Sequence, residues 1–241
     1  MSEFVEDCIR ACGEILDLIK ETPHEKLCQD LQVGFGGDLS RFIDIQAERI
    51  FVKYLGKYAQ IISEESGAIG EKSEFQIILD PIDGSDNFVS NIPYFGSSIA
   101  LMKNKKCIKA FVCNFANGDV FYKENSFLKK TNLQKNQIKN EHTNHFSKCG
   151  IFESSYKSEI FFPILKQMQI KFRSLGALAL SLSYARQVDF VLYEGELRAY
   201  DIEAGLYMCE DLYVKKDKNF IFVSKDKQIF DKIGEKLLKV G

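Results

Sequence analysis

The stretch QIILDPIDGSDNFVSNIPYFGSSIAL, residues 76–101, joins an apolar run to a polar turn. The apolar residues 77–79 predict a buried strand, which ends abruptly at Asp80. Asp83 follows three residues later, across a turn in which Pro81 restricts the backbone. Both carboxylates can therefore point at one site. Packing alone gives no reason for two acids, a proline and a glycine at the end of a buried strand, so we expect a functional site there.

Three more acids occupy positions from which they could join this turn. Glu64 ends another short apolar run, Asp38 precedes a predicted helix, and Asp201 stands where the chain enters a later one. Each acid alone is equally compatible with a turn former or a helix cap. Together they would form a crowded group, in which carboxylates repel one another unless a cation lies between them. Hard oxygen donors without histidine favour Mg²⁺ or Mn²⁺ over zinc.

Two common acidic motifs do not fit this stretch. An EF-hand loop needs an acid at its twelfth position. That position is Asn91 when the count starts at Asp80, and Tyr94 when it starts at Asp83. The aspartyl-phosphatase pattern has two aspartates one residue apart, whereas two residues separate Asp80 and Asp83 here.

The composition restricts the class of partner. Among 241 residues, 32 are Lys or Arg and 34 are Asp or Glu, so the formal net charge is −2. This near balance offers no basic face for nucleic acid. No segment resembles a signal peptide, and no apolar run approaches the ~20 residues of a membrane span. We expect a cytoplasmic protein without nucleic-acid or membrane partners, in which the seven scattered cysteines are reduced thiols.

Hydrophobic periodicity divides the chain into two halves. In the first, helices are predicted over residues 4–20 and 39–55, with a glycine-rich turn at 33–38 between them. Strands are predicted over 59–63, 75–80, 95–103, 106–116 and 119–124. Residues 125–147 are expected to be irregular. In the second, strands at 148–154, 170–175, 188–193 and 219–224 alternate with helices at 159–168, 177–186, 202–212 and 228–240. We expect an antiparallel-rich α+β half, 1–135, which carries most metal ligands, and an α/β half, 136–241, which carries Asp201 and substrate-side residues.

Four separated motifs carry a family resemblance. They are GGDLSRFIDIQAE (36–48), SEES (63–66), DPIDGSDNFVSNIPYFGSSIAL (80–101), and FRSLGALALSLSYARQVDF (172–190) followed by AYDIEAG (199–205). In this order they resemble the inositol monophosphatase-like family of magnesium-dependent, lithium-sensitive phosphatases, which includes dual inositol monophosphatase/fructose-1,6-bisphosphatase members. The resemblance covers about residues 4–211. It implies a layered α-β-α-β-α sugar phosphatase fold.

The resemblance also implies roles for individual residues. The ligands of a first metal would be Glu64, Asp80 and the Ile82 carbonyl, and those of a second would be Asp80, Asp83 and Asp201. Asp38 and the Ser85 hydroxyl, with Glu64, would orient and activate the attacking water. The backbone amides of Gly84 and Ser85 would hold the phosphate, because glycine permits close approach of the backbone.

Substrate contacts are expected from residues of both halves. They are Asp83, Gly84, Ser85, Arg173, Gly176, Ala177, Glu194 and Arg198. Arg198 could meet a second phosphate as a bidentate partner, or could face solvent beside Glu194 and Glu196, and both interpretations stay open.

The resulting hypothesis is a phosphomonoester hydrolase with two or three Mg²⁺ ions, for which Mn²⁺ can substitute. It would act on inositol 1-phosphate, fructose 1,6-bisphosphate or both, by in-line attack of a metal-activated water, and would form a homodimer. One alternative is a phosphatase for 3′-phosphoadenosine 5′-phosphate, another nucleotide or histidinol phosphate. An alternative of another class is a catalytically silent regulatory binding protein, which the intact set of predicted ligands disfavours. Two departures from the family are a glycine-rich turn without lysine and a shortened end after residue 211.

Overall fold

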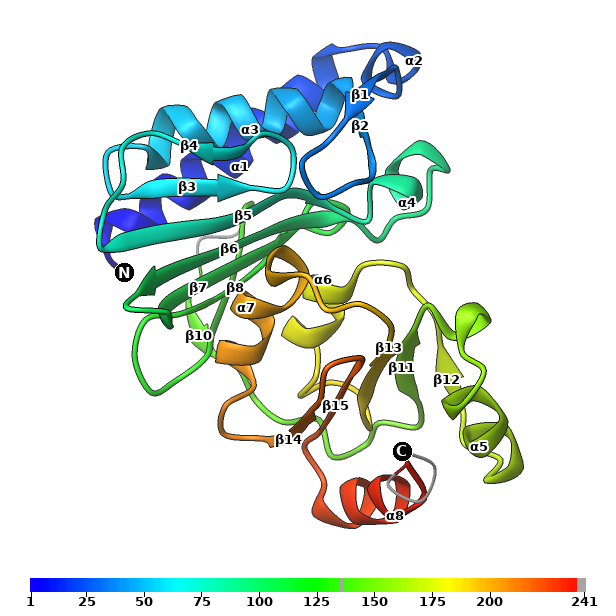
Figure 1. Cartoon of the computed structure of the whole chain (residues 1–241). Coiled ribbons are helices and arrows are strands. Elements are labelled where there is room, and N and C mark those ends of the chain that lie inside the picture. The colour runs from blue at the N-terminus through cyan, green and yellow to red at the C-terminus, as the bar shows by residue number, and fades with distance from the viewer. Residues whose placement is uncertain (135–136, 238–241) are drawn as a thin grey trace.

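The computed structural model describes residues 1–134 and 137–237. Its main sheet has eight strands (Figure 1). In spatial order they are β10 (Lys139–Asn140), β9 (Lys129–Asn132), β8 (Asp119–Lys123), β7 (Lys106–Asn114), β6 (Gly96–Lys103), β5 (Phe75–Asp83), β3 (Gln60–Ser63) and β4 (Gly67–Ile69). Neighbouring strands are antiparallel except β3 and β5, which are parallel. The antiparallel-rich first half is therefore confirmed.

A second sheet of five strands lies across the molecule from the first (Figure 1). Its spatial order is β12 (Phe172–Arg173), β11 (Gly150–Glu153), β13 (Val191–Glu194), β15 (Phe220–Ser224) and β14 (Tyr213–Lys216). The first three strands are parallel and the last two are antiparallel to their neighbours. A separate two-stranded ribbon contains β1 (Asp30–Val33) and β2 (Leu39–Arg41).

Helices alternate with the sheets to give five layers. Helices α1 (Glu3–Glu21) and α3 (Phe42–Leu55) pack on the outer face of the main sheet. Helices α6 (Leu178–Ser183) and α7 (Ala199–Met208) lie between the two sheets and share apolar cores with both. Helices α5 (Phe161–Gln167) and α8 (Lys227–Leu237) cover the outer face of the second sheet. The expected α-β-α-β-α architecture is confirmed.

The outer helices form where apolar residues recur at helical spacing. In α1, the residues Val5, Cys8, Cys12 and Ile15 follow this spacing and are fully buried against the main sheet. Short elements complete the chain: α2 (His24–Leu27), α4 (Ser85–Val89) and the 3₁₀ turn η1 (Ser155–Lys157). Within the described residues, no helix is both long and apolar enough to span a membrane.

Several expectations about elements are wrong. The segment 125–147 is not wholly irregular, because β9 and β10 within it extend the main sheet by pairing with β8 and with each other. Strands β1, β4 and β14 were not predicted, and β2 forms at the start of the helix expected over 39–55, which begins only at Phe42. Of the strand expected over 170–175, only the two residues of β12 form a strand. The end of the last predicted helix, residues 238–240, lies outside the described residues. The division after residue 135 stays a prediction.

Candidate active site

The parallel pairing of β3 and β5 brings the first two acids together. Ile61, Ile62 and Ser63 lie opposite residues 77–79 in register, so both strands end at the same edge of the sheet. The Glu64 backbone N–H donates to the Leu79 carbonyl at 3.1 Å, one residue before Asp80. The order of the strands thus places Glu64 next to Asp80.

The turn after Asp80 leaves the regular ladder. Asp80 faces Ser98 of β6 and Asp83 faces Gly96, with a break in register between the two pairs. Gly84 then takes a positive φ of 83°, a conformation that other residues adopt only with strain. A Cβ there would lie 3.0 Å from the Ala177 Cβ and 3.1 Å from the Tyr94 carbonyl oxygen. Glycine is therefore required where this turn meets the second half of the chain.

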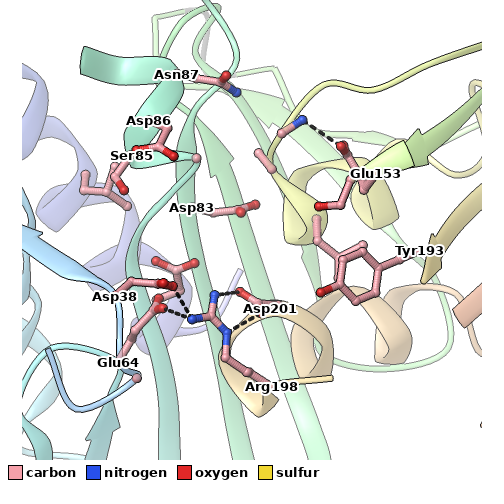
Figure 2. Close-up of a pocket in the computed structure, with 18 of the residues that line it drawn as sticks. Asp38, Glu64, Asp83, Ser85, Asp86, Asn87, Glu153, Tyr193, Arg198 and Asp201 are labelled. Carbon is pink, nitrogen blue, oxygen red and sulfur yellow. Dashed lines mark hydrogen bonds and ion pairs between the residues drawn. The ribbon is translucent and has the colours of Figure 1, made fainter. Parts of the chain in front are cut away.

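Asp201 enters the site from the second half. It lies in the first turn of α7, whose N-terminal end points at the carboxylates (Figure 2). The positive end of a helix stabilises a negative side chain in this position. Helix α7 begins at Ala199, three residues earlier than predicted, so that Asp201 belongs to the helix.

Asp38 lies on the glycine-rich turn between β1 and β2. This turn packs on the chain after β3: Gly36 N–H donates to the Glu64 carbonyl at 2.7 Å, and Phe35 N–H donates to the Glu65 carbonyl at 2.9 Å. A Cβ on Gly36 would lie 2.7 Å from the Cγ of Glu64. The glycine therefore allows the turn to approach the acids closely.

One arginine connects three of the acids (Figure 2). The Nη1 of Arg198 lies 2.9 Å from Glu64 Oε1 and also donates to Asp38 Oδ2. Its Nε donates to Asp201 Oδ2 at 2.9 Å, and its Nη2 donates to Asp201 Oδ1 at 3.4 Å. The guanidinium thus lies among acids contributed by three separate elements.

Burial and crowding perturb these groups. Burial raises the pKa of Glu64 to about 7, despite the opposing effect of Arg198. Burial and then the neighbouring acids raise the pKa of Asp80 and of Asp83 well above the ordinary value, and burial raises the pKa of Asp201. Burial disfavours the charge of Arg198, yet Asp201 and Glu64 raise its pKa overall. A site with this many buried acids requires positive charge to keep them ionised.

The acids line a cavity of about 970 Å³. Most of the expected site residues lie on its wall: Asp38, Glu64, Asp80, Ile82, Asp83, Gly84, Ser85, Gly176, Ala177, Arg198 and Asp201. Nine lining residues are acidic and three are basic, the latter being Arg41, Lys157 and Arg198. This imbalance of charge repels a phosphate ester unless cations are added.

The carboxylates fit a divalent metal ion. Glu64, Asp80 and Asp201 each offer an oxygen, and these three oxygens lie within 4.8 Å of one another. Oxygen donors of this kind are those that Mg²⁺ prefers. Asp83 faces the same cavity, and its Oδ2 accepts the Leu180 N–H at 2.8 Å. The guanidinium of Arg198 already supplies a positive charge between Glu64 and Asp201, which shows that the group can accommodate a cation.

Two of the expected substrate contacts lie away from the cavity. Glu194 accepts hydrogen bonds from the Ser158 hydroxyl and, at 3.2 Å, from the Phe161 N–H. Its carboxylate therefore caps the start of α5 and does not line this cavity. Arg173 is exposed and donates to the neighbouring Phe172 carbonyl at 2.8 Å. Spacing along the sequence could not reveal either local partner.

Asp38 and Ser85, expected to act as a pair, have different partners in the structure. Asp38 contacts Arg198, whereas the Ser85 hydroxyl accepts from Arg41 Nη1 at 2.9 Å. The Arg41 backbone N–H donates to Asp44 Oδ2 at 2.7 Å. Asp44 is buried, its pKa is raised by burial to about 7, and no described residue bonds its Oδ1. The acid linked to Ser85 through the Arg41 guanidinium is instead Asp86, whose Oδ1 accepts from Nη2 at 2.7 Å.

Sequence reasoning also missed the residues that hold the far wall. Glu153 Oε2 accepts the Leu175 N–H at 3.0 Å and the Gly176 N–H at 2.6 Å, and its Oε1 accepts the Ser181 hydroxyl. The Asn87 amide donates to the Leu175 carbonyl at 2.6 Å. The only available signals were a glutamate ending a predicted strand and an asparagine next to the acidic turn.

The layered fold and the acidic cavity between its two halves define a phosphatase. A model of the inositol monophosphatase family matches residues 2–212, and the chain belongs to that family. It is accordingly a phosphoric monoester hydrolase of a family that is generally metal-dependent.

Individual relatives differ in the substrates that their names give. The chain is 29% identical over 180 residues to a fructose-1,6-bisphosphatase/inositol-1-monophosphatase of Methanocaldococcus jannaschii, covering 73% of this chain and 69% of that one. It is 27% identical over 239 residues to a bifunctional NADP phosphatase/NAD kinase of Methanococcus maripaludis, covering 87% of this chain. The match spans only 42% of that bifunctional relative's length.

A solved structure shares the fold along almost the whole chain. It is the extragenic suppressor protein suhB from Bartonella henselae, with a TM-score of 0.80 and 24% identity, covering 99% of this chain and 98% of that one. At this level of identity the likeness concerns the fold alone.

Proposed function

We propose that the protein hydrolyses a small sugar or polyol phosphate, inositol 1-phosphate or fructose 1,6-bisphosphate, with Mg²⁺ as its cofactor. The observation that carries this proposal is the convergence of Glu64, Asp80 and Asp201 from β3, β5 and α7 on one cavity. Asp83 and the Ile82 carbonyl line the same wall. Bound Mg²⁺ would lower the pKa of a water molecule and neutralise charge on the phosphoryl oxygens.

The chain's own groups divide the remaining tasks. The turn at Gly84 and Ser85 presents backbone amides to the phosphate with no side chain at Gly84 in the way. The Ser85 hydroxyl, held by the Arg41 guanidinium, would orient water. Gly176 and Ala177, on the turn held by Glu153, form the opposite wall and would contact the alcohol part of the ester. A cytoplasmic location and a homodimer stay predictions of the sequence.

A nucleotide phosphate is the second candidate substrate. The cavity of about 970 Å³ lies near the upper end of the roughly 300–1,000 Å³ seen for ligand pockets, and so exceeds what inositol phosphate requires. One of the similar proteins is named an NADP phosphatase. Lys157 lines the cavity as one of its three basic residues and offers a charge for a second phosphate group.

The test is phosphate release from inositol 1-phosphate, fructose 1,6-bisphosphate, 3′-phosphoadenosine 5′-phosphate and NADP, with Mg²⁺ or with EDTA. We expect Mg²⁺-dependent turnover of at least one ester, and a loss of roughly 100-fold or more in Asp80→Asn, which removes electrostatic stabilisation of the transition state. Glu196→Gln is the matched control, since it removes one negative charge from the same cavity outside the group of three acids. Turnover that survives EDTA, or equal losses in both variants, would contradict the proposal.

A further inference from the structure

The position of Arg198 has a consequence for metal binding. Its side chain engages both carboxylate oxygens of Asp201, one oxygen of Glu64 and one of Asp38. Glu64 and Asp201 are two of the three acids whose oxygens converge within 4.8 Å. A metal ion that takes an oxygen from each of these two acids must therefore share with, or replace, the guanidinium.

The geometry favours replacement. A guanidinium and a divalent cation repel each other, and few oxygens of Glu64 and Asp201 remain for a second cation while Arg198 is bound. The Arg198 side chain is 29% exposed and lines the cavity, so it has room to move away from the acids. Asp38, its third partner, lies on an exposed turn and is 74% exposed itself. The contact with Asp38 can thus break without opening the core.

We propose that Arg198 is an internal counter-ion of the metal-free site, which leaves Glu64 and Asp201 when Mg²⁺ binds. The released guanidinium then faces the cavity, where it can pair with an anionic substrate. This inference rests on the proposed function, because it concerns the same acids. Arg198 would thus contact the acids in the absence of metal, and the substrate once metal is bound.

Removing the Arg198 side chain should change the affinity for Mg²⁺ in a direction that depends on its role. If Arg198 competes with the metal, removing it leaves the acids without a counter-ion and Mg²⁺ binds more tightly. If Arg198 instead orients Asp201 as a ligand, removing it weakens Mg²⁺ binding. The two roles are therefore separated by the direction of the change in affinity, with no need for an activity measurement.

The experiment is calorimetric titration of Mg²⁺ into the full-length wild-type protein, Arg198→Gln, Arg198→Lys and Lys157→Gln, all freed of metal beforehand. We expect Arg198→Gln to bind Mg²⁺ about tenfold more tightly or better, within the range of typical coupling between sites. Lys157→Gln removes the same charge from the same cavity without touching the three acids, so its smaller change measures the general electrostatic effect. Arg198→Lys keeps the charge and should stay near the wild type.

A second readout covers the stability of the metal-free state. In EDTA, Arg198→Gln should melt below the wild type, and its increase in Tm on adding Mg²⁺ should be larger than that of the wild type. Weaker or unchanged Mg²⁺ binding in a folded Arg198→Gln protein, or a change no larger than that of Lys157→Gln, would overturn the inference alone. Failure of both the wild type and Arg198→Gln to bind Mg²⁺ would overturn the proposed function as well.

Discussion

The carboxyl groups of the cavity wall can bind either a proton or a metal ion. Burial raises the pKa of Glu64 from 4.5 to about 7, and Asp80 and Asp83 are shifted in the same direction. A protonated carboxyl group offers no charge to a metal ion. Protons and Mg²⁺ therefore compete for these residues, and metal binding releases protons.

The competition predicts a pH-dependent stabilisation by metal. Because the pKa of Glu64 is raised in the folded metal-free protein, its contribution to stability is present below pH 4.5 and is lost as the pH rises through about 7. Mg²⁺ should thus increase Tm little at acidic pH and progressively more as the pH passes neutrality. Melting curves with Mg²⁺ and with EDTA across this range measure the difference. A shift in Tm that is independent of pH would contradict the assignment of Glu64.

Single residues were predictable where a motif ties chemistry to a backbone turn. Asp80, Asp83 and Gly84 lie where their sequence indicated, because the end of an apolar strand and a glycine constrain the backbone locally. Partners of long side chains were not predictable. Arg198 meets Asp38, which lies 160 residues away in sequence, and spacing carries no information about such a contact.

Among the elements, Glu153 at the end of β11 holds the turn of residues 174–177. Its carboxylate satisfies two backbone N–H groups, those of Leu175 and Gly176, and also the Ser181 hydroxyl. The side chain is buried. Removing it leaves the buried Ser181 hydroxyl and two partly buried backbone N–H groups without this acceptor, which is more costly than losing a fully exposed hydrogen bond.

We expect Glu153→Ala to lower the free energy of unfolding by about 1–3 kcal/mol. It should also raise KM more than it lowers kcat, because under the proposed function the turn would contact the substrate and not the metal-binding acids. Glu153→Gln keeps an acceptor for both amides and an amide group toward the Ser181 hydroxyl, so it should restore most of both losses. Urea unfolding and steady-state kinetics of the two variants provide the measurement. Equal behaviour of the two variants would show that the hydrogen bonds do not position the turn.

Elements were predictable in proportion to their apolar content. Helices α1 and α3 and strands β5 to β8 carry clear periodicity and form as expected. Strand β9 (Lys129–Asn132) has the sequence KKTN and only Thr131 is buried, so its pairing with β8 comes from the neighbouring strand and not from its own pattern. Context of this kind decides many short strands.

For the molecule as a whole, the site joins two halves whose cores are largely separate. The main sheet packs on α1 and α3, and the second sheet on α5 and α8. Helices α6 and α7 lie between the sheets, and both carry contacts to the acidic turn: Leu180 N–H to Asp83, and Asp201 itself. The order of these layers was implied by the family resemblance. Hydrophobic periodicity alone indicated an α+β half and an α/β half, but not the order of their layers.

A metal held across this junction should stabilise both halves together. Hydrogen exchange with and without Mg²⁺ should show protection of residues 63–66 and 80–87 in the first half and also of residues 199–205 in the second, because the three converging acids come from both. In Asp201→Asn, the bridge loses its ligand on α7, so protection of 199–205 should disappear and that of the first half should weaken. Protection confined to the first half of the wild-type protein would mean that Asp201 does not hold the metal. In that case the start of α7 would contact the acids of the first half through Arg198 and not through a shared metal ion.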